Sequence, residues 1–325
     1  MKLAPISPSH AARLSLAALL MLAFVTLSGA VLALWTVLHS DPPADVIEAC
    51  LRMMHSGLQL FSSYLSSSPF VTQAAIFFAL FSFFWALTRS AAAIFSSGRA
   101  VKGARPYRKG GSLKLDAILA EKLPLSKVPI RTLDSGGPQA FTGGLLRPRI
   151  YLSLGLIEAL SQAELQTVLL HELAHLEKKD PLKLLAARFV ADALWFIPLA
   201  RRLASTFADA AEKAADDHAV VYSRRPLDLA SAIVKVAKEG LALKPAPSLG
   251  SLSVEERVMR LLGAQGHPGA PCSLKSLLAS GVILMVLMSA LTWPLAASGL
   301  STKTSQALIP QWSLEPTVCT FMDQG

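Results

Sequence analysis

Three long runs of apolar residues constrain this sequence most, because each is long enough to cross a lipid bilayer as a helix. They cover about residues 11–38, 70–95 and 277–297, and the first two contain one charged residue each, Arg13 and Arg89. A hydrocarbon core of roughly 30 Å needs about 20 residues of helix. Hydrophobic residues make up 52% of the chain and charged residues only 16%, which favours an integral membrane protein over a soluble one.

The first run has a second interpretation, a secretory signal peptide. Lys2 and Arg13 could form its basic flank, and residues 28–30 resemble a cleavage site. The apolar residues continue to Trp35, however, well beyond the roughly 7–15 residues of a signal-peptide core. We therefore interpret this run as an uncleaved membrane anchor.

A weaker apolar stretch lies at residues 182–200. It contains Lys183, Arg188, Asp192 and Pro198, all of which disfavour a membrane crossing. An ionisable residue at the centre of a membrane helix costs about 2.5–3.5 kcal/mol on insertion scales. The sequence leaves two alternatives open, an extra membrane helix or an amphipathic or re-entrant helix.

Basic residues are distributed unevenly between the loops. They are concentrated after the second apolar run, as Arg99, Lys102, Arg105, Arg108, Lys109 and Lys114. The positive-inside rule then places the N-terminus and the long middle segment in the cytoplasm, and residues 41–69 and 298–325 outside. This bias explains much of the net charge of +9, and because the basic residues lack interleaved aromatic residues we expect no nucleic-acid partner.

These boundaries divide the chain into three regions. Residues 1–97 form a membrane region with two transmembrane helices and an external loop, and residues 98–273 form one cytoplasmic domain of ordinary size. Residues 274–325 hold the last transmembrane helix and a short external tail. The three cysteines are too few for a disulfide framework, but Cys50 and Cys319 share the external side, where a disulfide between them could persist.

The middle region begins as a small sheet and continues as helices. Short apolar runs within residues 128–153 alternate with glycine-containing turns such as residues 136–138. The next helix begins at Ser161, which forms a capping box with Glu164, and it ends before residues 180–181, Asp-Pro. The expected fold class is therefore α+β, mainly helical, in a multi-span membrane protein whose middle domain carries a small β-sheet.

This helix carries the pentapeptide His171-Glu172-Leu173-Ala174-His175. Histidines four residues apart lie on one helix face, so both imidazoles can bind the same metal ion. Glu172 can then act as a general base towards a water at an open metal position, and zinc lowers the pKa of such a water to about 7. Zn²⁺ is the expected cofactor, and a chance occurrence of the pentapeptide is the alternative.

A catalytic zinc needs a third protein ligand, and an acidic stretch downstream offers candidates. Glu212 and Asp216 are four residues apart and therefore share a helix face. On their own these carboxylates could form a solvated face that pairs with Lys213 and Arg201. Beside a histidine pair that lacks a third ligand, metal binding is the favoured interpretation.

Several short motifs occur in order between Gln139 and Leu262. They are Pro148-Arg-Ile-Tyr-Leu-Ser153, His171-Glu-Leu-Ala-His175 with Asp180, Trp195-Phe-Ile-Pro198, Glu212-Lys-Ala-Ala-Asp216 and Glu256-Arg-Val-Met-Arg-Leu261. Together they resemble the integral-membrane zinc peptidases related to the beta-lactam-responsive antirepressor peptidases. A more distant similarity is to prenyl-protease and heat-shock membrane peptidases, which commonly have Asn-Ala-Phe where this chain has Gln139-Ala140-Phe141.

The resemblance implies a gluzincin-like zinc peptidase domain and assigns its metal ligands. Glu212 would be the third zinc ligand beside His171 and His175. Asp216 would hold a ligand histidine by a hydrogen bond, which fixes the tautomer and orientation of its ring. Asp180 would cap or orient the end of the active-site helix.

The resemblance also suggests residues that contact the substrate. The strand of Ile150, Tyr151 and Leu152 would be the edge to which an extended substrate peptide adds. His218 and Tyr222 are candidate donors to the oxyanion of the reaction.

The expected protein is therefore a zinc metalloendopeptidase of a bacterial inner (plasma) membrane that cleaves a cytoplasmic or membrane-proximal protein, such as a transcriptional repressor. Its expected partners are a protein or peptide substrate and the lipid bilayer, and the sequence does not define an oligomeric state. Antibiotic-sensing relatives carry a large external penicillin-binding domain, so with the short tail of residues 298–325 we expect no direct beta-lactam sensing. The alternative is a signal-transducing membrane protein in which a non-catalytic zinc-peptidase fold serves as a binding or conformational module.

Overall fold

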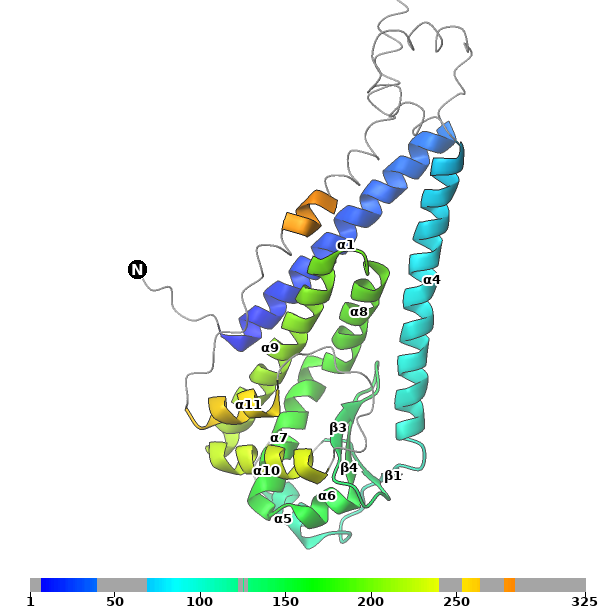
Figure 1. Cartoon of the computed structure of the whole chain (residues 1–325). Helices are drawn as coiled ribbons and strands as arrows, with labels where there is room; N and C mark the ends of the chain where they lie inside the picture. The colour runs from blue at the N-terminus through cyan, green and yellow to red at the C-terminus, as the bar shows by residue number, and fades with distance from the viewer. Residues whose placement is uncertain are drawn as a thin grey trace, which may run out of the picture. The chain divides into compact units, whose positions relative to one another are not determined.

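The computed structural model describes residues 7–39, 69–121, 125, 128–239, 253–263 and 278–283. Its elements (Figure 1) are α1 (Pro8–His39), α4 (Pro69–Ala100), β1 (Arg105–Pro106), α5 (Leu113–Ala120), β2 (Ile130–Leu133), β3 (Ala140–Gly143), β4 (Arg149–Ser153), α6 (Leu154–Ala159), α7 (Gln162–Lys178), α8 (Asp180–Ala193), α9 (Pro198–Ser223), α10 (Pro226–Glu239) and α11 (Val254–Leu261). The chain divides into two compact units, Met1–Leu27 with Gln73–Leu284 and Ser28–Thr72 with Met285–Gly325. The sheet and helices α5 to α11 belong to the first unit, and the predicted Cys50–Cys319 disulfide lies outside the described residues.

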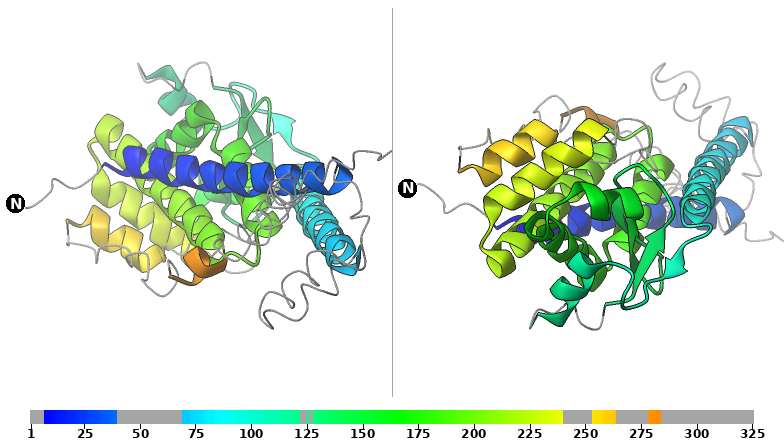
Figure 2. Two further views of the ribbon diagram at one scale, coloured as in Figure 1. Left: turned by 90° about the horizontal axis from the view of Figure 1, so that it is seen from above. Right: turned by 90° about the horizontal axis from the view of Figure 1, so that it is seen from below.

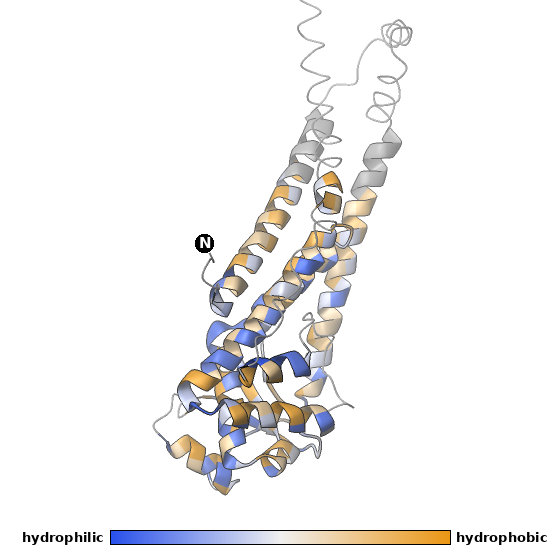
Figure 3. Cartoon of the chain, turned by 60° about the vertical axis from the view of Figure 1, so that its left-hand side comes forward, coloured by the Kyte–Doolittle hydropathy of each residue, from blue (hydrophilic) through white to orange (hydrophobic). Residues whose placement is uncertain are grey.

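Two helices coincide with the first two predicted membrane runs. Within them, Pro8–Ser28 and Phe77–Ala100 are long and apolar enough to cross a bilayer. Many of their large apolar side chains are exposed, as at Phe24 of α1 and Phe84 of α4, and the described parts of both helices are mostly apolar (Figure 3). Of the third predicted run, residues 277–297, the structure describes residues 278–283, which are helical.

Residues 182–200 do not form one helix. Helix α8 ends at Ala193 and α9 begins at Pro198, so a single extra membrane helix over this stretch is wrong. The break has a local cause, because proline lacks the N–H of a helix interior but is well suited to the first turn of a new helix. The two helices instead pack against each other as a hairpin.

This hairpin contacts both apolar helices. Leu19 of α1 is fully buried in a cluster with apolar side chains of α8 and α9. On the α4 side, the indole Nε1 of Trp195 donates a hydrogen bond to Ser82 Oγ at 3.1 Å, and Arg89 pairs with Asp192 at 3.1 Å. The pairing gives each charge a partner inside an otherwise apolar stretch, which reduces the cost of placing it there.

Four strands form a mixed sheet in the order β1-β2-β4-β3. Strands β2 and β4 are parallel, while β1 and β3 pair antiparallel with β2 and β4 respectively. The prediction of a mainly helical chain with a small sheet within residues 128–153 is therefore confirmed, and the short strand β1 extends that sheet.

The prediction that Ile150, Tyr151 and Leu152 form an edge strand is wrong. Their strand, β4, pairs with β2 on one side and with β3 on the other. The tight turn after β3 explains this pairing: Gly144 has a φ of +99°, and a Cβ there would lie 2.9 Å from the carbonyl oxygen of Arg147. The outer strand that contacts α7 is β3.

Helix α7 packs against the sheet, α9 and α10, and α11 lies beside α10 (Figure 2). The buried residues of α7 include Leu165, Leu169 and Leu173, which recur every fourth position and so form one apolar stripe. These leucines share a core with Ile150 and Leu152 of β4. The core therefore fixes the position of the helix that carries the pentapeptide.

Glu164 connects the start of α7 to α10. Its carboxylate accepts hydrogen bonds from the Ser161 backbone N–H at 2.8 Å, from Ser231 Oγ at 2.5 Å and from Lys235 Nζ at 2.8 Å. Burial alone would raise the pKa of Glu164, but the bonds from Lys235, Ser231 and Ser161 outweigh it and lower this pKa from 4.5 to about 2.

We expect the Glu164 network to lose its stabilising effect in acid. A carboxylate whose pKa is lowered by folding stabilises the fold above its unfolded pKa of 4.5, and this stabilisation is lost as the pH falls towards about 2. Glu164→Gln should flatten this part of the pH dependence and lower the free energy of unfolding at neutral pH by about 1–3 kcal/mol. Thermal unfolding in detergent across pH measures both effects. The exposed Glu158→Gln serves as the control, and identical acid profiles for Glu164→Gln and wild type would contradict the prediction.

Candidate metal centre

Two helices, α7 and α9, carry the predicted ligands. Helix α7 begins at the predicted capping box of Ser161 and Glu164, and His171 and His175 lie one turn apart on it. Helix α9 presents buried alanines such as Ala211 and Ala215. Small side chains let two helices approach closely, which allows short carboxylate side chains of α9 to reach the histidines of α7. The same helix α9 also packs near its start against α1.

Three predicted ligands, here called the ligand triad, converge on one point: His171, His175 and Glu212. The two imidazole Nε2 atoms are 3.2 Å apart; Glu212 Oε2 lies 3.6 Å from that of His171, and Glu212 Oε1 lies 3.6 Å from that of His175. The three ligand atoms all lie within 4.8 Å of one another. Two nitrogens bound at about 2.0–2.1 Å to one tetrahedral ion are about 3.3 Å apart, so the triad fits a single divalent cation.

The other ring nitrogen of each histidine faces a buried carboxylate. His175 Nδ1 lies 2.7 Å from Asp180, and His171 Nδ1 lies 3.0 Å from Asp216. Such partners hold the proton on Nδ1 and leave the Nε2 lone pair for a metal. The sequence suggested this arrangement for Asp216. For Asp180 it suggested only a role at the helix end, whereas the left-handed Lys179, with a φ of 52°, turns the chain so that Asp180 reaches His175.

Arg257 of α11 contacts two of these carboxylates. Its Nε and Nη2 donate to Asp216 at 3.1 and 2.6 Å, and its Nη1 lies 3.0 Å from Glu212. Burial alone would raise the pKa of Asp216, but His171 and Arg257 outweigh it and lower this pKa. Burial also opposes ionisation of Glu212, and there His171, His175 and Arg257 lower the pKa. Both carboxylates are therefore ionised at neutral pH.

Glu172 lies next to the triad and is held by the outer strand of the sheet. Thr142 Oγ1 of β3 lies 2.8 Å from the Glu172 carboxylate and 2.9 Å from the Glu172 backbone oxygen, so it can donate to either. Sequence reasoning missed this threonine. Its one signal was its place directly after Gln139-Ala140-Phe141, and the contact itself depends on how β3 meets α7.

His218 and Tyr222, the predicted oxyanion donors, have contacts elsewhere. His218 Nδ1 lies 3.1 Å from the Leu170 carbonyl oxygen and Nε2 lies 3.6 Å from Glu177. The Tyr222 ring packs on the His218 ring and is half exposed. None of these partners belongs to the ligand triad, so the role of His218 and Tyr222 stays a prediction.

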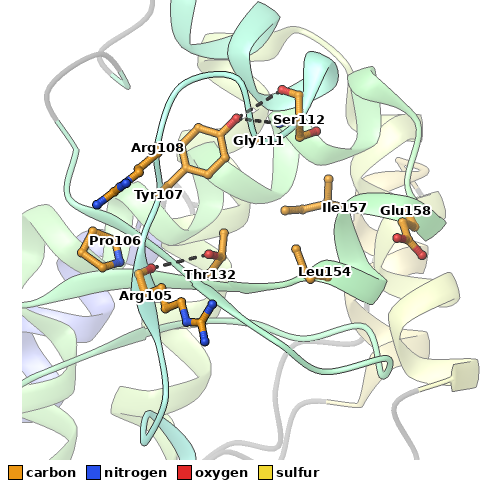
Figure 4. A pocket seen from close by; sticks show the side chains of 10 residues that line it. All are labelled: Arg105, Pro106, Tyr107, Arg108, Gly111, Ser112, Thr132, Leu154, Ile157 and Glu158. Carbon is orange, nitrogen blue, oxygen red and sulfur yellow. Dashed lines mark hydrogen bonds between the residues drawn. The ribbon is translucent and has the colours of Figure 1, made fainter.

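A cavity of about 700 Å³ lies at the opposite edge of the sheet, beside β1 (Figure 4). Arg105, Tyr107 and Thr132 help to line it, and the Tyr107 hydroxyl is already bonded to the Ser112 backbone and to Asp116. No residue that lines this cavity belongs to the ligand triad. The cavity is therefore separate from the metal centre.

Before a cation binds, the surroundings of His171 favour its imidazolium form, in which the metal-binding Nε2 also carries a proton. Burial alone would lower the pKa of His171, but Asp216 and Glu212 outweigh it and raise this pKa from 6.5 to about 10. A metal ion that binds Nε2 has to displace this proton, so metal binding and proton release are coupled.

We expect the apparent metal affinity to rise with pH, by up to about tenfold per unit below pH 10, because one proton leaves His171 for each ion bound. Metal titrations of the metal-free protein between pH 6.5 and 8.5 measure this slope. Asp216→Asn removes the main partner that raises the pKa, so its slope should flatten above neutral pH. A wild-type affinity that does not change with pH would contradict the coupling.

The contacts around the ligand triad define a class of site. Two histidines and a glutamate, with a carboxylate behind each imidazole and a further glutamate beside them, form the donor set of a hydrolytic metal centre. The two long apolar helices fit a membrane-associated protein that carries this centre.

Comparison with protein families assigns the chain to one family of peptidases. Residues 67–260, more than half of the chain, match the family described as BlaR1 peptidase M56. The chain belongs to this family, which confirms the resemblance to the beta-lactam-responsive antirepressor peptidases. A search of curated proteins gives no match. Membership points to a membrane-associated metallopeptidase with a role in signalling.

Proposed function

We propose that this protein is a membrane-embedded, zinc-dependent endopeptidase with a gluzincin-like domain. One observation carries the proposal: the Nε2 atoms of His171 and His175 and the carboxylate of Glu212 converge beside Glu172 in a member of a peptidase family. We assign the ligand triad as the zinc ligands and Glu172 as the general base.

In this proposal the protein groups hold and move protons around the metal. Zinc, when bound, lowers the pKa of a water and polarises a peptide carbonyl. Glu172 accepts a proton from the attacking water and passes it to the departing amine. Asp180 and Asp216 keep His175 and His171 in the tautomer that presents Nε2.

The substrate strand in this proposal is β3. An extended peptide can add to an outer strand through backbone hydrogen bonds, and β4 is closed to this because it is paired on both sides. Thr142 of β3 contacts Glu172 directly, so a peptide along β3 would lie beside the general base. The proposed substrate is a cytoplasmic or membrane-proximal protein with an extended segment at the cleavage site.

Cleavage of casein by the detergent-purified protein tests the proposed activity. We expect new internal cleavage sites by mass spectrometry, loss of cleavage with a zinc chelator, and recovery when zinc is added back. Release of terminal residues alone would contradict an endopeptidase, and recovery with other divalent ions but not zinc would contradict the cofactor.

We further propose that residues 98–273 lie on the cytoplasmic side of the inner membrane, between the membrane regions 1–97 and 274–325. The basic residues that follow Phe77–Ala100 support this orientation. Leu113 is 91% exposed and offers a labelling position in a chain whose native cysteines are replaced by serine. Leu113→Cys should react with a membrane-impermeant maleimide only after the inner membrane is opened, and labelling of intact cells would reverse the orientation.

Thr142 should position the general base. Thr142→Val removes one hydrogen bond to a charged group, so we expect kcat to fall about 10- to 100-fold while metal content stays unchanged. Thr142→Ser keeps the hydroxyl and should stay close to wild type. Equal impairment of the valine and serine variants, or a wild-type kcat for the valine variant, would exclude this role.

A further inference from the structure

The structure assigns Arg257 the role of a positioning residue for the metal centre. We infer that its guanidinium holds the carboxylate of Glu212 in the orientation that binds the metal, and holds Asp216 against His171. This inference rests on the proposed metal site and adds a residue outside the ligand triad on which metal affinity depends.

The guanidinium bridges two carboxylates that have different roles. Two of its nitrogens contact Asp216, at 3.1 and 2.6 Å, and the third lies 3.0 Å from Glu212 Oε2. The planar fork of arginine can serve two carboxylates at once, whereas the single ammonium of lysine cannot reproduce this geometry. Asp216 is fully buried, so its orientation depends on these contacts.

Glu212 needs such a partner when metal is bound. Its side chain is 35% exposed, and its ion-pair contacts among the described residues are with His171, His175 and Arg257. Once the two Nε2 lone pairs bind a metal, neither of these nitrogens can donate to Glu212. Of these three ion-pair partners, Arg257 is then the one that still donates to the glutamate and orients it towards the metal.

Charge alone predicts the opposite effect of Arg257. A cation beside a metal site repels the metal ion, so its removal would tighten metal binding. The contacts favour the positioning role, because without Arg257 the buried Asp216 would lose two of its bonds and Glu212 would lose its orientation. The sign of the change in metal affinity therefore distinguishes the two roles.

Helix α11 supplies a matched control. Arg260, one turn after Arg257, pairs with Asp217 and donates to the Lys213 backbone oxygen at 3.2 Å. Leu261 of α11 packs against the core, and both arginines add ion pairs with α9 that help to dock this helix. Arg260→Ala therefore weakens docking without touching the ligand triad or Asp216.

The test is the zinc affinity of metal-free, full-length protein in detergent, measured by competition with a chromophoric chelator. We expect Arg257→Ala to weaken zinc binding about 10- to 100-fold, as for other residues that orient metal ligands. Arg257→Lys should be intermediate, and Arg260→Ala should equal wild type. The absorption spectrum of bound Co²⁺ should change in Arg257→Ala and stay unchanged in Arg260→Ala.

Unchanged or tighter binding in Arg257→Ala would overturn the inference, as would an equal loss in Arg260→Ala, which would show that only docking of α11 matters. Failure of the proposed function gives a different result. If wild-type protein shows no zinc binding that depends on His171 and Glu212, the proposed metal site is wrong, and the role of Arg257 is lost with it. If Glu212→Ala abolishes zinc binding while Arg257→Ala binds zinc as tightly as wild type, the metal site stands and only the role of Arg257 is lost.

Discussion

Glu212→Ala should leave the purified protein without its metal ion. The substitution removes the one anionic member of the ligand triad and leaves two histidines, which is too few for a stable protein site. We expect the affinity to fall by more than about 100-fold, beyond the loss typical of residues that only orient a ligand. Metal per chain, measured by elemental analysis after gel filtration, reports the effect.

Glu177→Ala is the matched control for this experiment. Glu177 is a carboxylate on α7 that faces His218 and is half exposed, so its removal should not change the metal content. One metal ion per chain in both Glu212→Ala and His175→Ala would show that the metal lies elsewhere, and the ligand triad would have to be abandoned.

Glu172→Gln should keep the metal and lose peptide cleavage. Glutamine has the same shape and can still accept the hydrogen bond from Thr142, but its amide cannot take a proton from water. Loss of a positioned general base typically costs about 10²- to 10⁴-fold in rate. Cleavage of casein or a quenched fluorescent peptide, normalised to bound metal, measures this loss.

The outcome for Glu172→Gln also separates catalysis from a non-catalytic role. Full cleavage by this variant would place the general base elsewhere. If a cellular response that depends on this protein persists in Glu172→Gln, and wild type cleaves nothing, the fold acts as a binding or conformational module. A response that disappears with cleavage supports the endopeptidase.

Local sequence signals predicted the active-site helix well. The capping box of Ser161 and Glu164 and the Asp-Pro pair at residues 180–181 act within one turn of the chain, so they can be read without the fold. Pro198 is also a local signal, because proline is favoured in the first turn of a helix and α9 begins there.

The strand order was not predictable from the same signals. Each strand of the sheet has only two to five residues, and the sequence does not say which strand pairs with which. The tight turn at Gly144 returns the chain along β3, which covers the side of β4 that the sequence suggested was open. The error at Ile150–Leu152 is therefore an error of long-range pairing rather than of strand assignment.

In the candidate metal centre, too, residues close together in the sequence were predictable and long-range contacts were not. Spacing within one helix identified His171 and His175, and spacing within a second identified Glu212 and Asp216. Thr142 and Arg257 reach the centre from β3 and α11, far away along the chain, and their contacts exist only in the folded protein. Arg257 lies in a motif of the family resemblance and Thr142 follows another, but neither motif reveals which atoms these residues contact.

The most direct test of the metal-dependent peptidase is a titration of metal-free wild-type protein with zinc while peptide cleavage is recorded. The proposed function predicts that cleavage rises in proportion to added zinc and stops rising at one zinc ion per chain, with no such rise in Glu212→Ala. Absence of cleavage at every zinc concentration, or equal cleavage by Glu212→Ala, would contradict it.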